Sequence, residues 1–273
     1  MCACQGPRGP TAYSGVVPTH PRTALPAPAL AWLVRPEPVR VVTLGCSLGM
    51  VRRLADLGHG VVTVDADPTR IARLSARHQP EGRVMGLVGR PDHLPLQPCV
   101  AQVVLVQGPL QVQGEQTVRR EAAHSQISRT LQPGGWVAGW RIVRDDSVPW
   151  VRRLIALMRS VDPDAMSGST TDDHEDLLAS RYFPRVERRD FRLWLPINRD
   201  GLIDMLTSQQ PVTQLDDAAR HHLIAAASQI LESAAPAQEM RLPYTLKCWR
   251  AHTDHHELTQ PLAFGDGALI IPI

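Results

Sequence analysis

The chain has 273 residues, 43% of them hydrophobic, which is enough to bury one substantial core with an additional cap. Its formal charge is only +2, and basic residues are interspersed with acidic ones, which argues against nucleic acid as a partner. Five scattered cysteines fit neither a disulfide framework nor a four-ligand zinc site, and no apolar run reaches membrane-spanning length. We therefore expect a cytoplasmic protein with no metal site and no membrane segment.

The first 22 residues are rich in Pro, Gly and Thr and are predicted to form an irregular arm, with His20 near its end. Cys2-x-Cys4 lies in this arm, and an unordered tail is favoured there over a metal site. A short helix is predicted between Thr23 and Val34, at the start of a domain that spans residues 23–251.

Apolar strand patterns alternate with helical patterns in the next hundred residues. The predicted strands span 39–44, 60–64, 83–88, 101–106 and 135–142, and the predicted helices span 48–58, 68–77 and 115–131. This alternation predicts an α/β fold, a doubly wound and mostly parallel sheet with helices on both faces. Ligands bind such sheets beyond the carboxyl ends of the strands, so we expect the site there.

The region 145–240 is predicted to be a helical cap insertion that partly covers the ligand site. Its clearest helix spans 216–233, with Asp216 as a candidate N-cap. The segment 242–250 has strand character and is predicted to return to the sheet as an edge strand. The His-rich tail 252–273 is predicted to be exposed, which is favoured over a metal site.

The strongest functional signal is the strand Val41–Leu44, which runs into a turn containing Gly45 and Gly49 and is followed by a helical pattern. The next strand ends in Asp65, a carboxylate suited to accept hydrogen bonds from a ribose diol. Together they indicate an adenosine-type cofactor. A nicotinamide cofactor is disfavoured because Ser47 and Met50 occupy the second and third positions of the G-x-G-x-x-G pattern.

These residues resemble the class I S-adenosylmethionine-dependent methyltransferases, especially the branch with the methyltransferase type 11 domain. Residues 41–49 are similar to that family's VLDLGCGTG strand and turn, and Asp65-Ala66-Asp67-Pro68 to its ribose-binding signature. Residues 89–96 are similar to its GDAEALPF segment, and 131–135 to its LKPGG turn. The resemblance covers most of residues 16–251.

The resemblance implies a seven-stranded Rossmann-like sheet, S-adenosylmethionine as cofactor and a small-molecule methyl acceptor. It also implies a cofactor site in which the turn holds the amino-acid end, the second strand the ribose and the third loop the adenine: Gly45, Cys46, Ser47 and Gly49, then Asp65 and Ala66, then Asp92 and His93. Cys46 in this turn is expected to be a small packed residue and not a nucleophile.

Several polar positions depart from the family's pattern. The acid of its first strand is Thr43 here, and the middle glycine of its turn is Ser47, whose Cβ penalises a positive φ. Its adenine-loop acid is Arg90, and two further pairs are Ala101-Gln102 and Gln111-Val112. These changes motivate an alternative, a methyltransferase-like binding or regulatory protein that has lost catalysis.

Methyl transfer from a sulfonium needs alignment more than a strong catalytic group, because the donor is already activated. A base helps only if the acceptor is a hydroxyl or an amine, and His20 and His93 are weak candidates for it. The acceptor, the atom that is methylated and the oligomeric state stay open.

Overall fold

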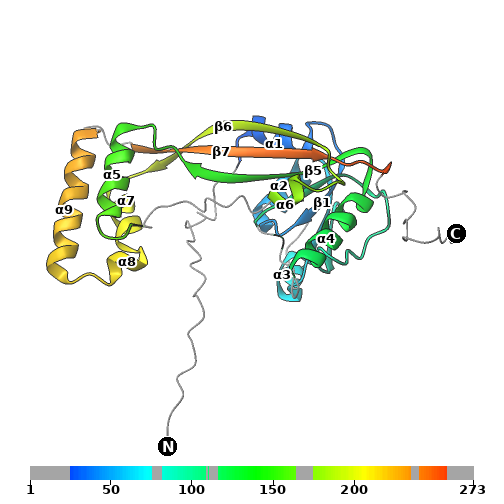
Figure 1. Ribbon diagram of the computed structural model, residues 1–273, viewed down its shortest axis with the longest axis horizontal. Coiled ribbons are helices and arrows are strands. Elements are labelled where there is room, and N and C mark those ends of the chain that lie inside the picture. The colour runs from blue at the N-terminus through cyan, green and yellow to red at the C-terminus, as the bar shows by residue number, and fades with distance from the viewer. Residues whose placement is uncertain are drawn as a thin grey trace, which may run out of the picture.

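The computed structural model describes residues 25–75, 82–108, 110, 116–163, 175–234 and 240–256. In this part of the chain seven strands form one sheet in the order β3-β2-β1-β4-β5-β7-β6 (Figure 1). The strands are β1 Arg40–Leu44, β2 Gly60–Asp65, β3 Val84–Val88, β4 Ala101–Val106, β5 Leu131–Arg144, β6 Arg185–Ile197 and β7 Met240–His252. The helices are α1 Ala27–Val34, α2 Leu48–Asp56, α3 Pro68–Ser75, α4 Gln116–Thr130, α5 Pro149–Arg159, α6 Glu175–Leu178, α7 Arg199–Thr207, α8 Gln210–Thr213 and α9 Asp217–Ala234.

Strands β1 to β5 are mutually parallel, and β7 is antiparallel to both β5 and β6. Leu44 at the end of β1 pairs with Val64 of β2 and with Val106 of β4. The carboxyl ends of these three strands are therefore level, which brings the segments that follow them to one edge of the sheet. The mostly parallel α/β class predicted from the sequence is confirmed.

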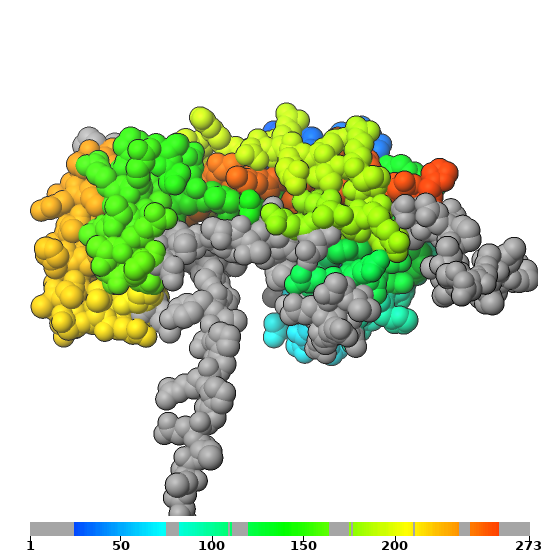
Figure 2. Space-filling model, viewed as in Figure 1, coloured from blue at the N-terminus to red at the C-terminus, as the bar shows by residue number. Residues whose placement is uncertain are grey.

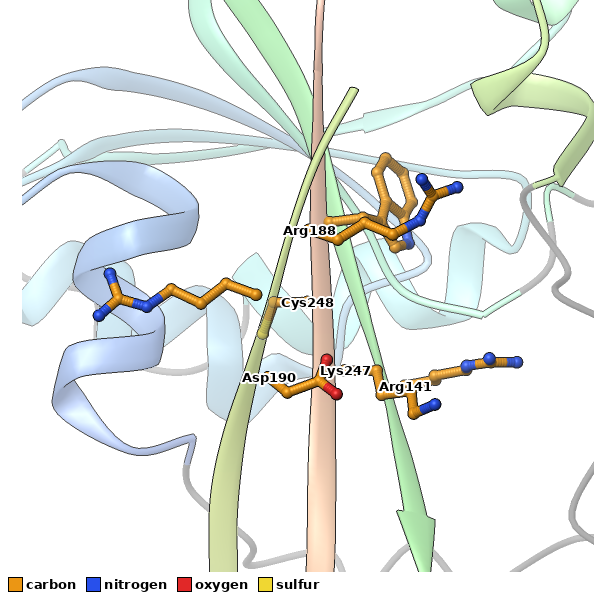
Figure 3. A pocket seen from close by; sticks show the side chains of 7 residues that line it. Arg141, Arg188, Asp190, Lys247 and Cys248 are labelled. Atoms are coloured by element: carbon orange, nitrogen blue, oxygen red, sulfur yellow. The ribbon is translucent and has the colours of Figure 1, made fainter. Parts of the chain in front are cut away.

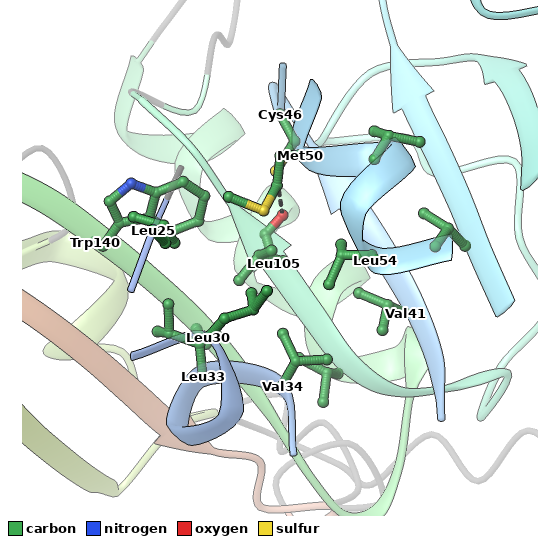
Figure 4. Packing of buried hydrophobic residues seen from close by; sticks show 14 of the residues in the cluster. Leu25, Leu30, Leu33, Val34, Val41, Cys46, Met50, Leu54, Leu105 and Trp140 are labelled. Atoms are coloured by element: carbon green, nitrogen blue, oxygen red, sulfur yellow. Dashed lines mark hydrogen bonds between the residues drawn. The ribbon is translucent and has the colours of Figure 1, made fainter. Parts of the chain in front are cut away.

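Helices cover both faces of the parallel part of the sheet. One buried cluster joins Leu33 of α1, Leu54 of α2 and Leu74 of α3 to the sheet, and Figure 4 shows part of this packing. The opposite cluster contains Ile127 of α4 and Leu177 of α6. Each apolar face of the sheet thus packs against helices, as expected for a doubly wound fold.

The three longest strands, β5, β6 and β7, extend past the parallel strands into a second helical region (Figures 1 and 2). We call α5, α7, α8 and α9 with these strand ends the helical unit. Its own core includes Leu154, Leu202 and Leu223 together with Leu242 of β7. The predicted cap of α9 is present, because Asp216 Oδ1 accepts a hydrogen bond from Ala219 N at 2.7 Å.

The helical unit lies on the side of the sheet where a ligand site is expected. The chain leaves the carboxyl end of β5 and enters α5 of this unit. Since β1 and β4 run parallel to β5, their carboxyl ends point in the same direction. The region between 145 and 240 therefore projects beyond the carboxyl edge, but it also contributes β6 to the sheet.

Two expectations for the second half of the chain were wrong. The strand near 242–250 is not an edge strand, because β7 lies between β5 and β6, and β6 forms the edge. The segment from 252 does not begin as an exposed tail: His252 is the last residue of β7, and His255 Nε2 lies 2.9 Å from the carbonyl oxygen of Leu131. Sheet pairing extends further along the chain than its apolar pattern indicated.

Some expectations fall outside the described residues: the arm 1–22 with Cys2, Cys4 and His20, the pair Gln111-Val112, and the tail from 257. In the part of the chain that the structure describes, no helix is long and apolar enough to span a membrane.

Candidate cofactor site

The turn after β1 depends on the glycine at its first position. Gly45 has a φ of +68°, and a Cβ placed on it would lie 2.6 Å from the carbonyl oxygen of Gln107. Two independent features therefore disfavour a side chain at this position: the left-handed backbone and the close approach of the segment after β4. The Gln107 side chain also reaches back, and its Oε1 accepts a hydrogen bond from Ser47 N at 3.1 Å.

Ser47 does not strain the turn, contrary to the expectation that its Cβ would oppose a positive φ. Its φ is −68°, and its hydroxyl accepts a hydrogen bond from Met50 N as the N-cap of α2. A serine is a favourable N-cap, so the change from the family's glycine is compatible with the same strand, turn and helix. Gly49 lies in the first turn of α2, where a Cβ would contact only Ser47 Oγ, at 4.0 Å.

Cys46 is a packed residue, as expected. Its side chain is 2% exposed, and its Sγ donates to the carbonyl oxygen of Leu105 at 3.6 Å (Figure 4). Burial raises the pKa of this thiol to about 12, although the nearby Arg70 acts in the opposite direction. The thiol therefore stays protonated at neutral pH and cannot act as a nucleophile.

Asp65 lies next to the turn after β1, as the order of the strands predicted. Its Oδ1 accepts a hydrogen bond from Asp67 N at 2.9 Å, which shapes the bend at the exposed Ala66. Its Oδ2 forms an ion pair with Arg70 Nη1 at 3.1 Å, and Arg70 Nη2 donates to the carbonyl oxygen of Cys46 at 3.2 Å. Arg70 thus links the end of β2 to the turn after β1.

In the loop after β3, Asp92 is held by the arginine that replaces the family's acid. Arg90 donates to both oxygens of this carboxylate, at 3.0 Å and 2.5 Å, and the Asp92 side chain is only 8% exposed. His93 is exposed, and its backbone N–H donates to the Arg90 carbonyl oxygen at 3.0 Å. The negative charge of Asp92 is therefore neutralised within the loop.

The other two departures that the structure describes have roles inside the sheet. The Thr43 hydroxyl is buried and lies 2.9 Å from the hydroxyl of Thr63 on β2. Gln102 Oε1 accepts a hydrogen bond from Arg40 N at 2.8 Å, at the amino end of β1. Neither side chain carries a carboxylate, so neither takes over the role of the family's acid.

Sequence reasoning missed two residues of this site, Arg70 and Gln107. Arg70 is on the first turns of α3, five residues after Asp65, and Gln107 directly follows β4. Their positions were visible in the sequence, but the bonds that they form depend on how neighbouring loops meet. A polar residue immediately after the strand adjacent to β1 is the signal that could have indicated Gln107.

Residues 42–139 match the model of the methyltransferase domain family. Uncharacterised methyltransferases of Mycobacterium tuberculosis and Mycobacterium bovis are each 26% identical to this chain over 234 residues, 84% of this chain and 90% of theirs. A solved structure from Anaeromyxobacter dehalogenans, assigned to the type II methyltransferases, aligns with a TM-score of 0.53 and 20% identity, over 78% of this chain and 89% of that one. Residues 42–139 therefore carry a methyltransferase domain, and the sheet order with this strand, turn and helix is similar to that of the class I S-adenosylmethionine-dependent methyltransferases.

Proposed function

We propose that this methyltransferase acts on a small-molecule acceptor and binds S-adenosylmethionine between the turn after β1 and the loops after β2 and β3. The observation that carries the cofactor placement is the pair of contacts made by Arg70. Arg70 lies 3.1 Å from the Asp65 carboxylate and 3.2 Å from the Cys46 carbonyl oxygen, so it links that carboxylate to the backbone of the turn. A carboxylate and a tight turn at adjacent strand ends are what a nucleoside with a charged tail requires.

The groups at this edge fit such a cofactor. Within the described residues, the backbone N–H groups of Leu48 and Gly49 at the start of α2 have no hydrogen-bond partner, and a helix N-terminus attracts a carboxylate. They would hold the amino-acid end. Asp65 would accept hydrogen bonds from the ribose, since each carboxylate oxygen here has one protein partner and a carboxylate offers about four acceptor sites.

Asp92 and His93 would lie beside the adenine, one strand further from the turn. This order runs along the edge from β3 to β2 to β1, so the sulfonium would lie towards β4 and β5. The bound cofactor supplies an activated methyl group, and the protein supplies alignment and exclusion of water. In this arrangement the exposed His93, which follows β3, would be too far from the sulfonium to act as a base for the acceptor.

Calorimetric titration with S-adenosylhomocysteine tests this placement, with Asp65→Asn and Asp67→Asn as a matched pair. Both substitutions remove one negative charge and keep an oxygen for the backbone N–H that each carboxylate accepts. Asp65→Asn should weaken binding by roughly tenfold or more, the loss expected for a hydrogen bond to a charged group. Asp67→Asn should change it little, because the Asp67 oxygen caps Thr69 N of α3 at 2.8 Å.

Two results would contradict the proposal. One is the absence of any binding of S-adenosylhomocysteine to the unmodified protein at millimolar concentration. The other is an equal loss of affinity in the two variants, which would mean that Asp65 has no contact that Asp67 lacks. Thermal unfolding of each variant without ligand shows whether a loss of affinity reflects a loss of folded protein.

A further inference from the structure

The three long strands carry a basic pocket of about 400 Å³, within the size range of small-molecule sites. Arg141 of β5, Arg188 and Asp190 of β6, and Lys247 and Trp249 of β7 line it. Figure 3 shows the side chains of Arg141, Arg188, Lys247 and Asp190 around it. These residues are far apart in the sequence and meet only because the strands pair.

The register explains why one face of the strands is basic. Lys247 pairs with Arg141 on one side and with Asp190 on the other, so these three form one row across the strands. Trp249 pairs with Arg188 and begins the next row on the same face, two residues further along β7. Arg189 and Cys248 also border the pocket, but they pair with each other on the opposite face, where the Arg189 guanidinium lies 5.2 Å from the centre of the Phe191 ring.

This face has an excess of positive charge. Of the residues that line the pocket, three cations on this face, Arg141, Arg188 and Lys247, accompany a single carboxylate, that of Asp190. Within the described part of the chain, no carboxylate lies at ion-pairing distance from Arg188 or Lys247. Lys247 is also the only lysine among the 29 basic Lys and Arg residues of the sequence. An oxyanion bound in this pocket would give Arg188 and Lys247 an anionic partner that the described residues do not provide.

The pocket adjoins the proposed position of the sulfonium. Gly139 of β5 pairs with Val106, the last residue of β4, and the Trp249 indole lies against Gly139. Arg141 is two residues further along β5, level with the segment after β4. That segment begins with Gln107, which accepts the hydrogen bond from Ser47 in the cofactor turn. With strands about 4.8 Å apart, β5 is about 10 Å from β1 across the sheet.

We propose that this pocket binds the methyl acceptor through an oxyanion group, a carboxylate or a phosphate, held by Arg141, Arg188 and Lys247. This assignment rests on the proposed function, because it uses the direction in which the bound cofactor would present its methyl group. The acceptor is then an anionic small molecule, oriented by its charged group against the strands while its reactive atom faces the end of β4.

The single lysine gives a direct test. A water-soluble acetylating reagent modifies lysine side chains, so the rate of Lys247 acetylation can be followed by mass spectrometry of the peptide that contains it. Inorganic phosphate and succinate serve as separate probes, each compared with sodium chloride at the same ionic strength. We expect either anion, or both, to slow the acetylation in a saturable manner that chloride does not reproduce.

The control variants separate a pocket from general charge screening. Arg188→Gln should lower the affinity for the protecting anion by roughly tenfold, as expected for the loss of one charged hydrogen bond. Arg73→Gln removes the same charge from an exposed position on α3, at the other end of the sheet, and should leave protection unchanged. A similar loss in both variants would overturn the proposal.

Binding of S-adenosylhomocysteine, followed by thermal shift in the same samples, keeps the two proposals apart. Binding of this ligand without protection by phosphate or succinate would overturn the anionic acceptor and leave the proposed function intact. Protection without binding of this ligand would overturn the proposed function and, with it, the assignment of the pocket to an acceptor.

Discussion

Replacing Gly45 by alanine tests how tightly the turn after β1 is constrained. The left-handed backbone at φ +68° costs a residue with a Cβ about 1–2 kcal/mol. The new methyl group would also lie 2.6 Å from the Gln107 carbonyl oxygen, so this segment must shift. Gln107 N donates to the Leu44 carbonyl oxygen at 3.0 Å, and weakening that bond adds about 1 kcal/mol. We expect Gly45→Ala to lower the free energy of unfolding by about 2–3 kcal/mol.

Urea unfolding followed by tryptophan fluorescence measures this change, with Gly49→Ala as the control. Gly49 has no positive φ, and its added Cβ would contact only Ser47 Oγ at 4.0 Å, so the substitution should be neutral or stabilise by up to about 1 kcal/mol. The affinity of the Gly49→Ala variant for S-adenosylhomocysteine should nevertheless fall, because the added methyl group fills space proposed for the ligand. Equal stability of the two variants would refute this account of the turn.

Three further outcomes follow from buried or paired groups. Thr43→Val should cost about 1–3 kcal/mol by leaving the buried Thr63 hydroxyl without its partner, whereas the double variant Thr43→Val/Thr63→Val should recover most of the loss; a urea-unfolding cycle measures both. Hydrogen bonds from Arg250 hold the pKa of Glu187 below its ordinary value of 4.5, so this carboxylate stabilises the fold above that pH and the contribution is lost as the pH falls through the lowered pKa. Glu187→Gln should therefore be less stable than the unmodified protein at pH 7, with a difference that shrinks below pH 4.5 in thermal unfolding scans. Cys46 should resist iodoacetamide at pH 8 in the native protein and react in urea, as mass spectrometry of its peptide would show.

The parallel half of the fold could be predicted from the sequence because its strands are short and apolar on both faces. Val41, Val42 and Leu44 are all buried, and such a run between glycine-containing turns is recognisable without a structure. β6 could not be predicted in this way. Its sequence RVERRDFRLWLPI begins with a charged stretch, and only its second half alternates, with Leu193 as the one fully buried residue. The charged first half also pairs with β7, and that pairing is not local in sequence.

The same contrast applies to the site. Asp65 and Gly45 were predictable as neighbours, since adjacent parallel strands place their ends together. The contacts of Arg70 and Gln107 were not, because each crosses from one loop to another and depends on side-chain reach. The serine at position 47 was misjudged for a related reason: its effect depends on its φ, and the helix cap that permits a negative φ forms only in the folded turn.

The proposed cofactor site and the proposed acceptor pocket lie in different parts of the sheet. The cofactor turn and Asp65 belong to short parallel strands inside the α/β core, whereas the basic pocket belongs to β5, β6 and β7. Those three strands also carry part of the core of the helical unit, including Leu193 and Leu242, so packing at their far end fixes the positions of the pocket residues. In the proposed arrangement, substitutions on the pocket face would change the charge that the acceptor must carry, while the turn after β1 would keep its geometry.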